Sequence, residues 1–223
     1  MRLKQYKKAL MFLSSAIIPV ILYALMLKIN GIFPFGNTSN LIWDLQIQYA
    51  DLMAFYQRVL HGEANLIYSF SKGLGGDIIG TFAFYLSSPI NLLLFFFRQD
   101  QIPLFIFVSS CIKLAFAGLT FSIFSHYRFA GLPNYLVIAL SIAYSLSQYN
   151  VSQISNIMWL DGVYMLPLMC LGAYKIANGK NPYLFFVSTA LSIIFNWYTA
   201  YMNCIYVVLY FMFELLQSKE AFC

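Results

Sequence analysis

Hydrophobic residues follow one another in long blocks along the chain, and short polar segments separate these blocks. A helix that crosses a bilayer needs about 20 apolar residues, and most of the blocks reach or approach that length. The pattern predicts an all-α, polytopic transmembrane fold in which residues 1–223 form the N-terminal part of one transmembrane domain. The predicted spans are about 9–29, 102–125, 133–149, 159–177, 183–196 and 200–217.

The last two spans come from one apolar block, 183–217, which is too long for a single comfortable crossing. Asn196, Trp197 and Tyr198 interrupt this block with polar and interfacial side chains, which favour the membrane surface. We therefore expect two short crossings, with the break between them on the outer side of the membrane.

A large outer loop, 30–101, is expected between the first two spans, and it contains two apolar segments of its own. In the segment 44–62 the apolar residues recur at helical spacing, which predicts an amphipathic helix lying flat on the bilayer. The segment 78–97 is apolar enough to cross, but Ser87-Ser88-Pro89 breaks its middle. We expect 78–97 to be an interfacial or re-entrant segment.

The positions of Lys and Arg favour this layout. Four of the basic residues, Arg2, Lys4, Lys7 and Lys8, precede the first span and predict a cytoplasmic N-terminus. If 78–97 does not cross, most of the other Lys and Arg also face the cytoplasm, whereas a crossing would remove this bias. The carboxylates then gather outside, apart from two near the C-terminal end.

Composition agrees with a membrane protein and argues against a nucleic-acid partner. The chain is 61% hydrophobic and only 9% charged, whereas a soluble domain has about 25% charged residues and needs them for its solvated surface. The net charge of +5 comes largely from the basic N-terminus, which is typical of a cytoplasmic anchor. The four cysteines are widely spaced, so we interpret them as packing residues in the membrane.

The helix predicted at 44–62 carries a polar stripe. Asp44, Gln48 and Asp51 lie at positions i, i+4 and i+7, so they share one face. Two interpretations remain open. Asp44 and Asp51 are candidate catalytic acids, or they are solvated surface residues, with Asp44 as the N-cap of the helix.

Two further ionisable residues lie in or beside predicted spans. Asp161 follows Trp159 at the outer edge of a span, where it is a functional candidate or a helix cap with a tryptophan anchor beside it. Lys113 lies in the middle of a span, and we expect it to pair with an acid on a helix outside this chain or with a lipid phosphate.

The segment from Tyr68 to Asp77 contains three closely spaced glycines and Lys72. Glycines such as Gly75 let backbone N–H groups approach an anion, and Lys72 would add positive charge. The simpler alternative is a flexible turn between two interfacial helices. A nucleotide-type phosphate loop is not matched, and no His, Cys or carboxylate spacing indicates a metal site.

Five segments together resemble the YfhO family of bacterial membrane proteins, and they occur over nearly the whole chain. They are Pro34-Phe35-Gly36, Asp44 to Asp51, Tyr68 to Gly76, Leu86 to Leu92 and Asn156 to Asp161. Each segment is weak alone, whereas the combination is specific. Family members are several times longer, so the resemblance implies that this chain is the N-terminal third or less of a protein in the bacterial plasma membrane.

The family in turn resembles the GT-C glycosyltransferases, whose first outer loop carries an essential acid and whose later outer loop carries another. Asp44 matches the first acid, and Asp161 is the candidate for the second. The resemblance implies transfer of a sugar from a polyprenyl-phosphate donor, such as undecaprenyl phosphate, to lipoteichoic acid or a related polymer of the cell envelope. Membrane lipid, donor and acceptor polymer are therefore the expected partners.

This chemistry assigns roles to the candidate residues. A polyprenyl phosphate is a good leaving group, so the enzyme needs chiefly a base for the acceptor hydroxyl and cations for the departing phosphate. We expect Asp44 to be the base or to orient the acceptor, with Asp51 and Asp161 as supporting acids, or as ligands if a divalent metal is used. The candidate substrate-binding residues are Gln48, Arg58, Lys72, Gly75 and Trp159.

Two other functions remain open at this point. A transporter or flippase of lipid-linked glycans would place polar residues at the midplane of several helices and show repeated halves, whereas here the polar residues gather at one face. For a non-catalytic membrane scaffold, Asp44→Asn should leave glycosylation of the polymer intact.

Overall fold

A computed structural model describes residues 2–70 and 72–220 of the chain, and its regular secondary structure is almost entirely helical. A two-stranded antiparallel hairpin is the exception; it pairs β1 (Tyr68–Ser69) with β2 (Gly76–Asp77). The α-helices of the described ranges are α1 (Arg2–Ile29), α2 (Ala50–Leu60), α3 (Ile79–Thr81), α4 (Ile102–Arg128), α5 (Asn134–Ser145), α6 (Gln148–Ser152), α7 (Leu160–Ala177), α8 (Tyr183–Phe195) and α9 (Trp197–Glu220).

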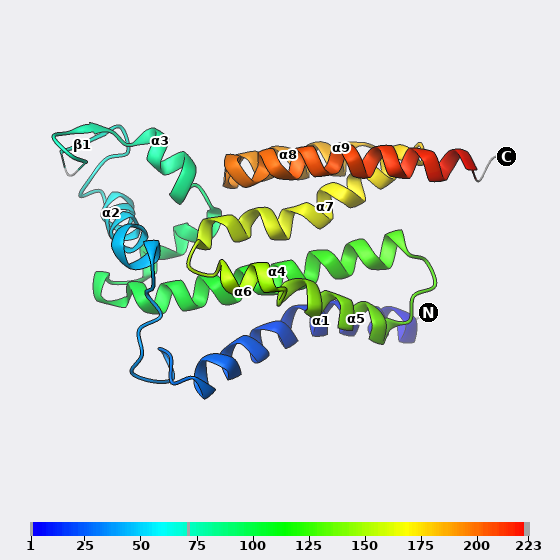
Figure 1. Cartoon of the computed structure of the whole chain (residues 1–223), viewed down its shortest axis with the longest axis horizontal. Coiled ribbons are helices and arrows are strands. Elements are labelled where there is room, and N and C mark those ends of the chain that lie inside the picture. The colour runs from blue at the N-terminus through cyan, green and yellow to red at the C-terminus, as the bar shows by residue number, and fades with distance from the viewer. Residues whose placement is uncertain (1, 71, 221–223) are drawn as a thin grey trace.

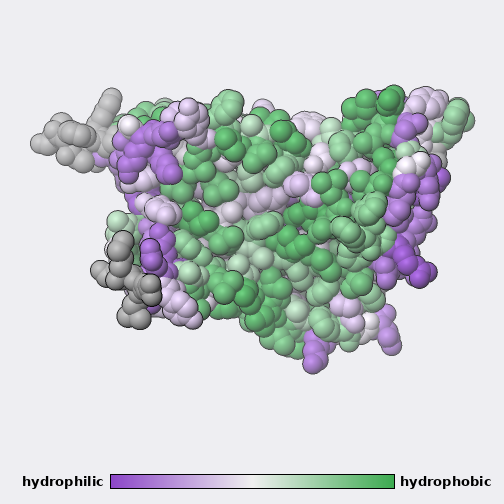
Figure 2. All heavy atoms as spheres, turned by 180° about the vertical axis from the view of Figure 1, so that it is seen from behind, coloured by the Kyte–Doolittle hydropathy of each residue, from purple (hydrophilic) through white to green (hydrophobic). Residues whose placement is uncertain are grey.

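Several of these helices are built to cross a membrane. Four segments are long and apolar enough: Gln5–Ile29, Gln99–Arg128, Ile157–Ala177 and Trp197–Gln217. Figure 2 shows hydrophobic side chains over the middle of the molecule and hydrophilic ones at its two ends, which is the distribution that a bilayer requires. The predicted all-α, polytopic membrane fold is confirmed.

The long helices lie side by side, and the outer-loop elements gather at one end. In Figure 1 both chain termini lie at the right, whereas α2, α3 and β1 lie at the left. Helices α4 and α7 pack against each other in the centre; α1 and α5 also pack on α4, and α8 and α9 on α7. The described cysteines, Cys111, Cys170 and Cys204, are free and at least half-buried, while Cys223 lies outside the described residues.

The contact between α1 and α4 depends on a glycine. A Cβ atom at Gly118 would collide with the carbonyl oxygen of Ser15 and would lie 3.3 Å from the Pro19 ring. We expect Gly118→Ala to lower the free energy of unfolding by about 1–3 kcal/mol, because the two helices must move apart. Gly80→Ala is the matched control, since nothing lies within 4 Å of a Cβ there. Thermal unfolding in detergent measures both, and equal losses would contradict the close approach.

The predicted span 133–149 is shorter as a helix than the sequence suggests, because α5 ends at Ser145. The buried amide of Asn150 donates hydrogen bonds to the carbonyl oxygens of Tyr144 at 2.9 Å and Ser145 at 3.0 Å. The last carbonyls of a helix need such partners, above all where water is scarce. Asn150 thus allows the helix to stop and the chain to turn into α6.

The block 183–217 forms two helices, as its length suggested, and the break between them is only one residue wide. Helix α8 ends at Phe195 and α9 begins at Trp197, with Asn196 extended between them. The Asn196 side-chain oxygen accepts hydrogen bonds from the N–H and the hydroxyl of Thr199, both at 2.9 Å. Asn196 is therefore the N-cap of α9, which explains where the block bends.

The segment 78–97 bends sharply at the expected place. Residues Ile79–Leu86 and Pro89–Phe96 are two helical pieces at 95° to each other, joined by Ser87 and Ser88. Figure 1 shows the first piece entering from the α2 end of the molecule and the second returning toward that end. We call these two pieces, residues 79–96, the re-entrant hairpin, after the expectation that the segment does not cross the membrane.

Candidate functional site

The predicted interfacial helix 44–62 consists of a π-helical turn, Leu45–Tyr49, followed by α2. One side is buried in a hydrophobic cluster with the re-entrant hairpin and the start of α4; its residues from this helix are Leu45, Tyr49, Met53 and Tyr56. The predicted polar stripe, Asp44, Gln48 and Asp51, is exposed. Asp44 occupies the N-cap position of the π-helical turn, as one interpretation expected, but its side chain makes no capping hydrogen bond there.

Three of the predicted site residues line one small cleft. Gln48, Asp51 and Lys72 come from the turn before α2, from α2 and from the β-hairpin. The cleft measures about 250 Å³, and its complete lining is Gln48, Asp51, Leu52, Phe55, Ser69, Lys72, Ile78 and Thr81. We call it the loop cleft. Its volume lies just below the range typical of ligand sites, which fits one part of a ligand, such as a sugar ring or a phosphate, rather than the whole of an extended one.

The glycine-rich segment around Lys72 forms the turn of the short β1–β2 hairpin, which lies between α2 and α3. Gly75 has a φ of +108°, and a Cβ there would collide with the Tyr68 hydroxyl, so this position requires glycine. The Lys72 ammonium donates a hydrogen bond to the Asp77 carbonyl oxygen at 2.6 Å. An ammonium has three donors, so two remain for an anion in the loop cleft.

Asp44 lies one turn before Gln48 and directly after a strained residue. Trp43 has a φ of +53°, which is rare for a residue with a bulky side chain. Strained backbone of this kind is concentrated at functional sites. Within the described chain, no ion pair involves Asp44 or Asp51. Both carboxylates are therefore free to accept a proton or a hydrogen bond from a ligand.

Tyr49 connects the Asp44 segment to the motif at Asn156. Its hydroxyl oxygen lies 3.0 Å from the side-chain oxygen of Asn156 and 3.4 Å from a carboxylate oxygen of Asp44. Burial, followed by the negative charge of Asp44, raises the pKa of Tyr49 to about 12. Tyr49 therefore remains a neutral hydrogen-bond donor at any physiological pH. The sequence did not predict this role, because the helical spacing indicated only that Tyr49 lies on the apolar face.

Removing this hydroxyl should loosen the connection. We expect Tyr49→Phe to lower the free energy of unfolding by about 1 kcal/mol below pH 10, because the Asn156 oxygen loses its donor. Between pH 10, the ordinary pKa of tyrosine, and pH 12, the phenol ionises in the unfolded state but not in the folded state, and this favours unfolding of the wild type. The difference in the free energy of unfolding between wild type and variant should therefore shrink as the pH rises from 10 toward 12. Chemical unfolding at several pH values measures it. A difference independent of pH would contradict the assignment.

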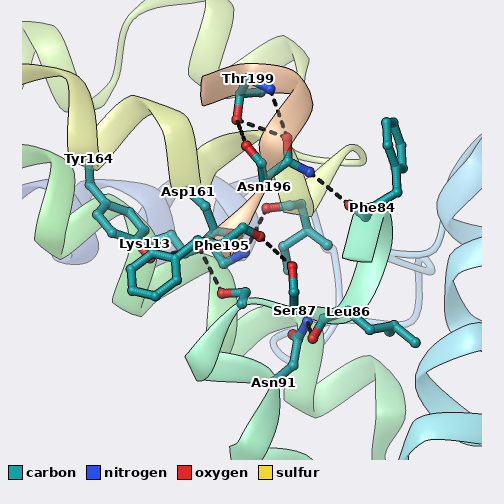
Figure 3. Close-up of polar contacts among 12 residues, drawn as sticks. Phe84, Leu86, Ser87, Asn91, Lys113, Asp161, Tyr164, Phe195, Asn196 and Thr199 are labelled. Carbon is teal, nitrogen blue, oxygen red and sulfur yellow. Dashed lines mark hydrogen bonds and ion pairs between the residues drawn. The ribbon is translucent and has the colours of Figure 1, made fainter. Parts of the chain in front are cut away.

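The other predicted acid has a different environment. Asp161 is completely buried in the first turn of α7, so the expectation that it faces the same aqueous boundary as Asp44 is wrong. Its partner is Lys113 of α4, at 2.7 Å (Figure 3). The expectation that Lys113 pairs outside this chain or with a lipid is also wrong. A lone buried charge is too costly at this depth, and the two opposite charges offset each other.

Hydrogen bonds complete the surroundings of this ion pair. Ser88 and Tyr164 each donate a hydroxyl hydrogen bond of 2.7 Å to one oxygen of Asp161. Lys113 also donates to the carbonyl oxygen of Ile157 at 2.8 Å. The sequence showed Lys113 and Asp161 in or beside predicted spans, and it showed the break at Ser88. It did not indicate that α4, α7 and the re-entrant hairpin bring these three residues together.

Two other candidate residues lie apart from the loop cleft. Arg58 is exposed and lies 3.6 Å from the carboxylate of Glu63, outside the lining of the cleft. Trp159 lines a second hollow of about 340 Å³ between α7, α9 and the end of α5, and its indole nitrogen is buried with no partner among the described residues. The structure thus separates Arg58 and Trp159 from Lys72.

No group of three or more His, Cys, Asp or Glu side chains in residues 2–70 and 72–220 is arranged to hold a metal ion. Asp44 and Asp51 supply two carboxylates on one exposed face, and Asp161 is held by Lys113 instead. The chemistry that these residues offer directly is proton acceptance by a carboxylate and anion binding by Lys72.

Comparison with known proteins fits these features. The profile of the family described as "Bacterial membrane protein YfhO" matches residues 14–223. The chain belongs to the YfhO family. It is 25% identical over 235 aligned residues to the "Uncharacterized protein YfhO" of Bacillus subtilis (strain 168), an alignment that covers 96% of this chain and 26% of that protein. The chain therefore spans about a quarter of the length of this YfhO relative. No solved structure matches the chain.

Membership of the YfhO family, together with the apolar helices, makes this a multi-pass membrane protein. The matched region includes the loop cleft, the re-entrant hairpin and the ion pair between Lys113 and Asp161. The features of the site therefore lie within the part of the chain that defines it as a YfhO protein.

Proposed function

We propose that this chain contributes to the transfer of a sugar from a polyprenyl-phosphate donor to an acceptor outside the cytoplasm, such as lipoteichoic acid. One observation carries the proposal: exposed Asp51 lines a small cleft together with Lys72, at one end of the apolar helices (Figure 1). Exposed Asp44 lies one helical turn before Gln48 of the same cleft, and neither acid has an ionic partner in the described chain. In the proposal, a carboxylate accepts the proton and Lys72 binds the anion of a lipid-linked phosphate at the membrane surface.

In this mechanism Asp44 accepts the proton of the acceptor hydroxyl as that oxygen attacks the anomeric carbon. The bond between that carbon and the phosphate oxygen breaks, and polyprenyl phosphate leaves with the negative charge. Lys72 stabilises the departing phosphate, while Asp51 and Gln48 orient the hydroxyl groups of the sugar in the loop cleft. The protein lies in the plasma membrane in this proposal, with its N-terminus in the cytoplasm and the loop 30–101 on the outer side.

The function is tested with membranes that contain the protein encoded by the complete gene. They are incubated with lipoteichoic acid and a panel of polyprenyl-phosphate donors that carry radiolabelled hexoses or N-acetylhexosamines. Label is expected in the polymer, and membranes from a strain lacking the gene are the control. If no donor labels the polymer, the transferase proposal fails. Movement of donor across the bilayer without transfer would indicate a flippase instead.

A further inference from the structure

The buried ion pair between α4 and α7 is connected directly to the tip of the re-entrant hairpin. The Ser88 hydroxyl, at the bend of the hairpin, donates a hydrogen bond to one carboxylate oxygen of Asp161. The other oxygen of Asp161 accepts a hydrogen bond from the Lys113 ammonium (Figure 3). These side chains are almost completely buried. Three elements far apart in the sequence thus meet at a single carboxylate.

Two more hydrogen bonds hold the same bend on the α8–α9 junction. The Ser87 hydroxyl donates to the carbonyl oxygen of Phe195 at 2.9 Å, and the Asn196 amide donates to the carbonyl oxygen of Phe84 at 2.7 Å (Figure 3). The backbone of a bent segment has unpaired polar groups that lipid cannot satisfy. These contacts satisfy some of them and hold the bend in one place.

The re-entrant hairpin also shapes the loop cleft. Thr81, in its first limb, and Ile78, just before it, line the cleft opposite α2. Leu86 and Leu94 of the hairpin are fully buried in the same hydrophobic cluster as Met53 of α2. A shift of the hairpin would therefore change the cleft and the position of α2, which carries Asp51.

We propose that Asp161 is a positioning residue: paired with Lys113, it holds Ser88 and so fixes the hairpin that forms one wall of the loop cleft. Its effect on sugar transfer rests on the function proposed above, whereas its effect on the hairpin does not. Both carboxylate oxygens of Asp161 are occupied, and the group has no exposed surface to meet a substrate. This separates its role from that of Asp44.

The first test measures the position of the hairpin. Leu94→Cys is introduced into the complete protein after the natural cysteines have been replaced, and its reaction with a water-soluble maleimide is timed. Leu94 is fully buried, so labelling reports loosening of the second limb. Ser88→Ala and Tyr164→Phe each remove one 2.7 Å hydrogen bond to the same oxygen of Asp161, but only Ser88 belongs to the hairpin.

Ser88→Ala is expected to speed labelling at least ~5-fold, because the bend opens more often, and Tyr164→Phe to leave it within ~2-fold. Folded protein is confirmed by size-exclusion chromatography for each variant. Equal rates in both variants, or no change with Ser88→Ala, would overturn the proposal.

The second test separates positioning from catalysis. Asp161→Asn leaves Lys113 buried without an ionic partner, so the KM for the donor should rise at least ~10-fold. The double variant Lys113→Gln/Asp161→Asn keeps neutral hydrogen-bonding groups at both positions and should recover most of the activity. A folded double variant with normal labelling of Leu94→Cys but no transfer would make Asp161 a catalytic acid and overturn the proposal. If even the unaltered protein transfers no sugar, the proposed function fails, and the labelling rates still decide the role of Asp161.

Discussion

Asp44→Asn should reduce sugar transfer to the acceptor polymer by at least ~100-fold, because general-base catalysis typically contributes 10²–10⁴-fold and an amide cannot accept the proton. The side chain is exposed and makes no ion pair in the described chain, so the protein should fold and accumulate normally. The measurement is the initial rate of label transfer in washed membranes, normalised to the amount of protein.

Asp100→Asn is the matched control for this variant. Asp100 is another exposed acid of the outer loop, and it lies 3.2 Å from Arg98 rather than beside the loop cleft. We expect its substitution to leave the transfer rate within ~2-fold, as for surface changes in general. A full transfer rate with Asp44→Asn would remove Asp44 as the base, and the scaffold interpretation would then gain support.

The second large effect concerns stability. Asp161→Leu should lower the free energy of unfolding by about 3–5 kcal/mol, because it leaves the Lys113 ammonium uncompensated in a site where it is 1% exposed. The double variant Lys113→Met/Asp161→Leu should recover most of the loss, since a buried ion pair is often replaceable by apolar side chains of similar volume. Unfolding in detergent with increasing denaturant measures both.

The ion pair at the other end of the bundle provides a comparison. Arg128 and Glu214 are 2.6 Å apart, and Arg128 also donates to Gln217 at the edge of the molecule. Arg128 is partly exposed, so water can solvate it when Glu214 is lost, and Glu214→Gln should cost less than Asp161→Leu. A larger loss at Glu214 than at Asp161 would contradict the burial argument.

The location of the polar residues bears on the competing function. A transporter should have polar side chains near the midplane of several helices. In the described chain, Lys113 and Asp161 pair with each other, and Ser88, Tyr164 and a backbone carbonyl complete their hydrogen bonds. The carboxylates without ionic partners, Asp44 and Asp51, instead lie in and just before α2, and Asp51 lines the loop cleft. This distribution favours chemistry at one surface.

Prediction from the sequence was strongest where a local pattern suffices. The spacing of apolar residues in 44–62 is that of a helix, and α2 buries Met53 and Tyr56 as that spacing requires. Ser87-Ser88-Pro89 predicted a break, since proline cannot continue a helix without losing a hydrogen bond, and the chain bends there by 95°. The end of α5 at Ser145 was missed, because its cap, Asn150, lies beyond the helix and acts through space.

The sequence by itself determined that this chain belongs in lipid and which segments form its long helices. It also determined that Asp44, Gln48 and Asp51 share a face, because hydropathy and helical periodicity are local properties. Only the tertiary structure decided which side chains meet. It brought Lys72 to the loop cleft with Asp51, and it turned Asp161 inward to Lys113 and Ser88. The partner of a buried charge depends on how distant helices pack, and no spacing along one chain segment records that.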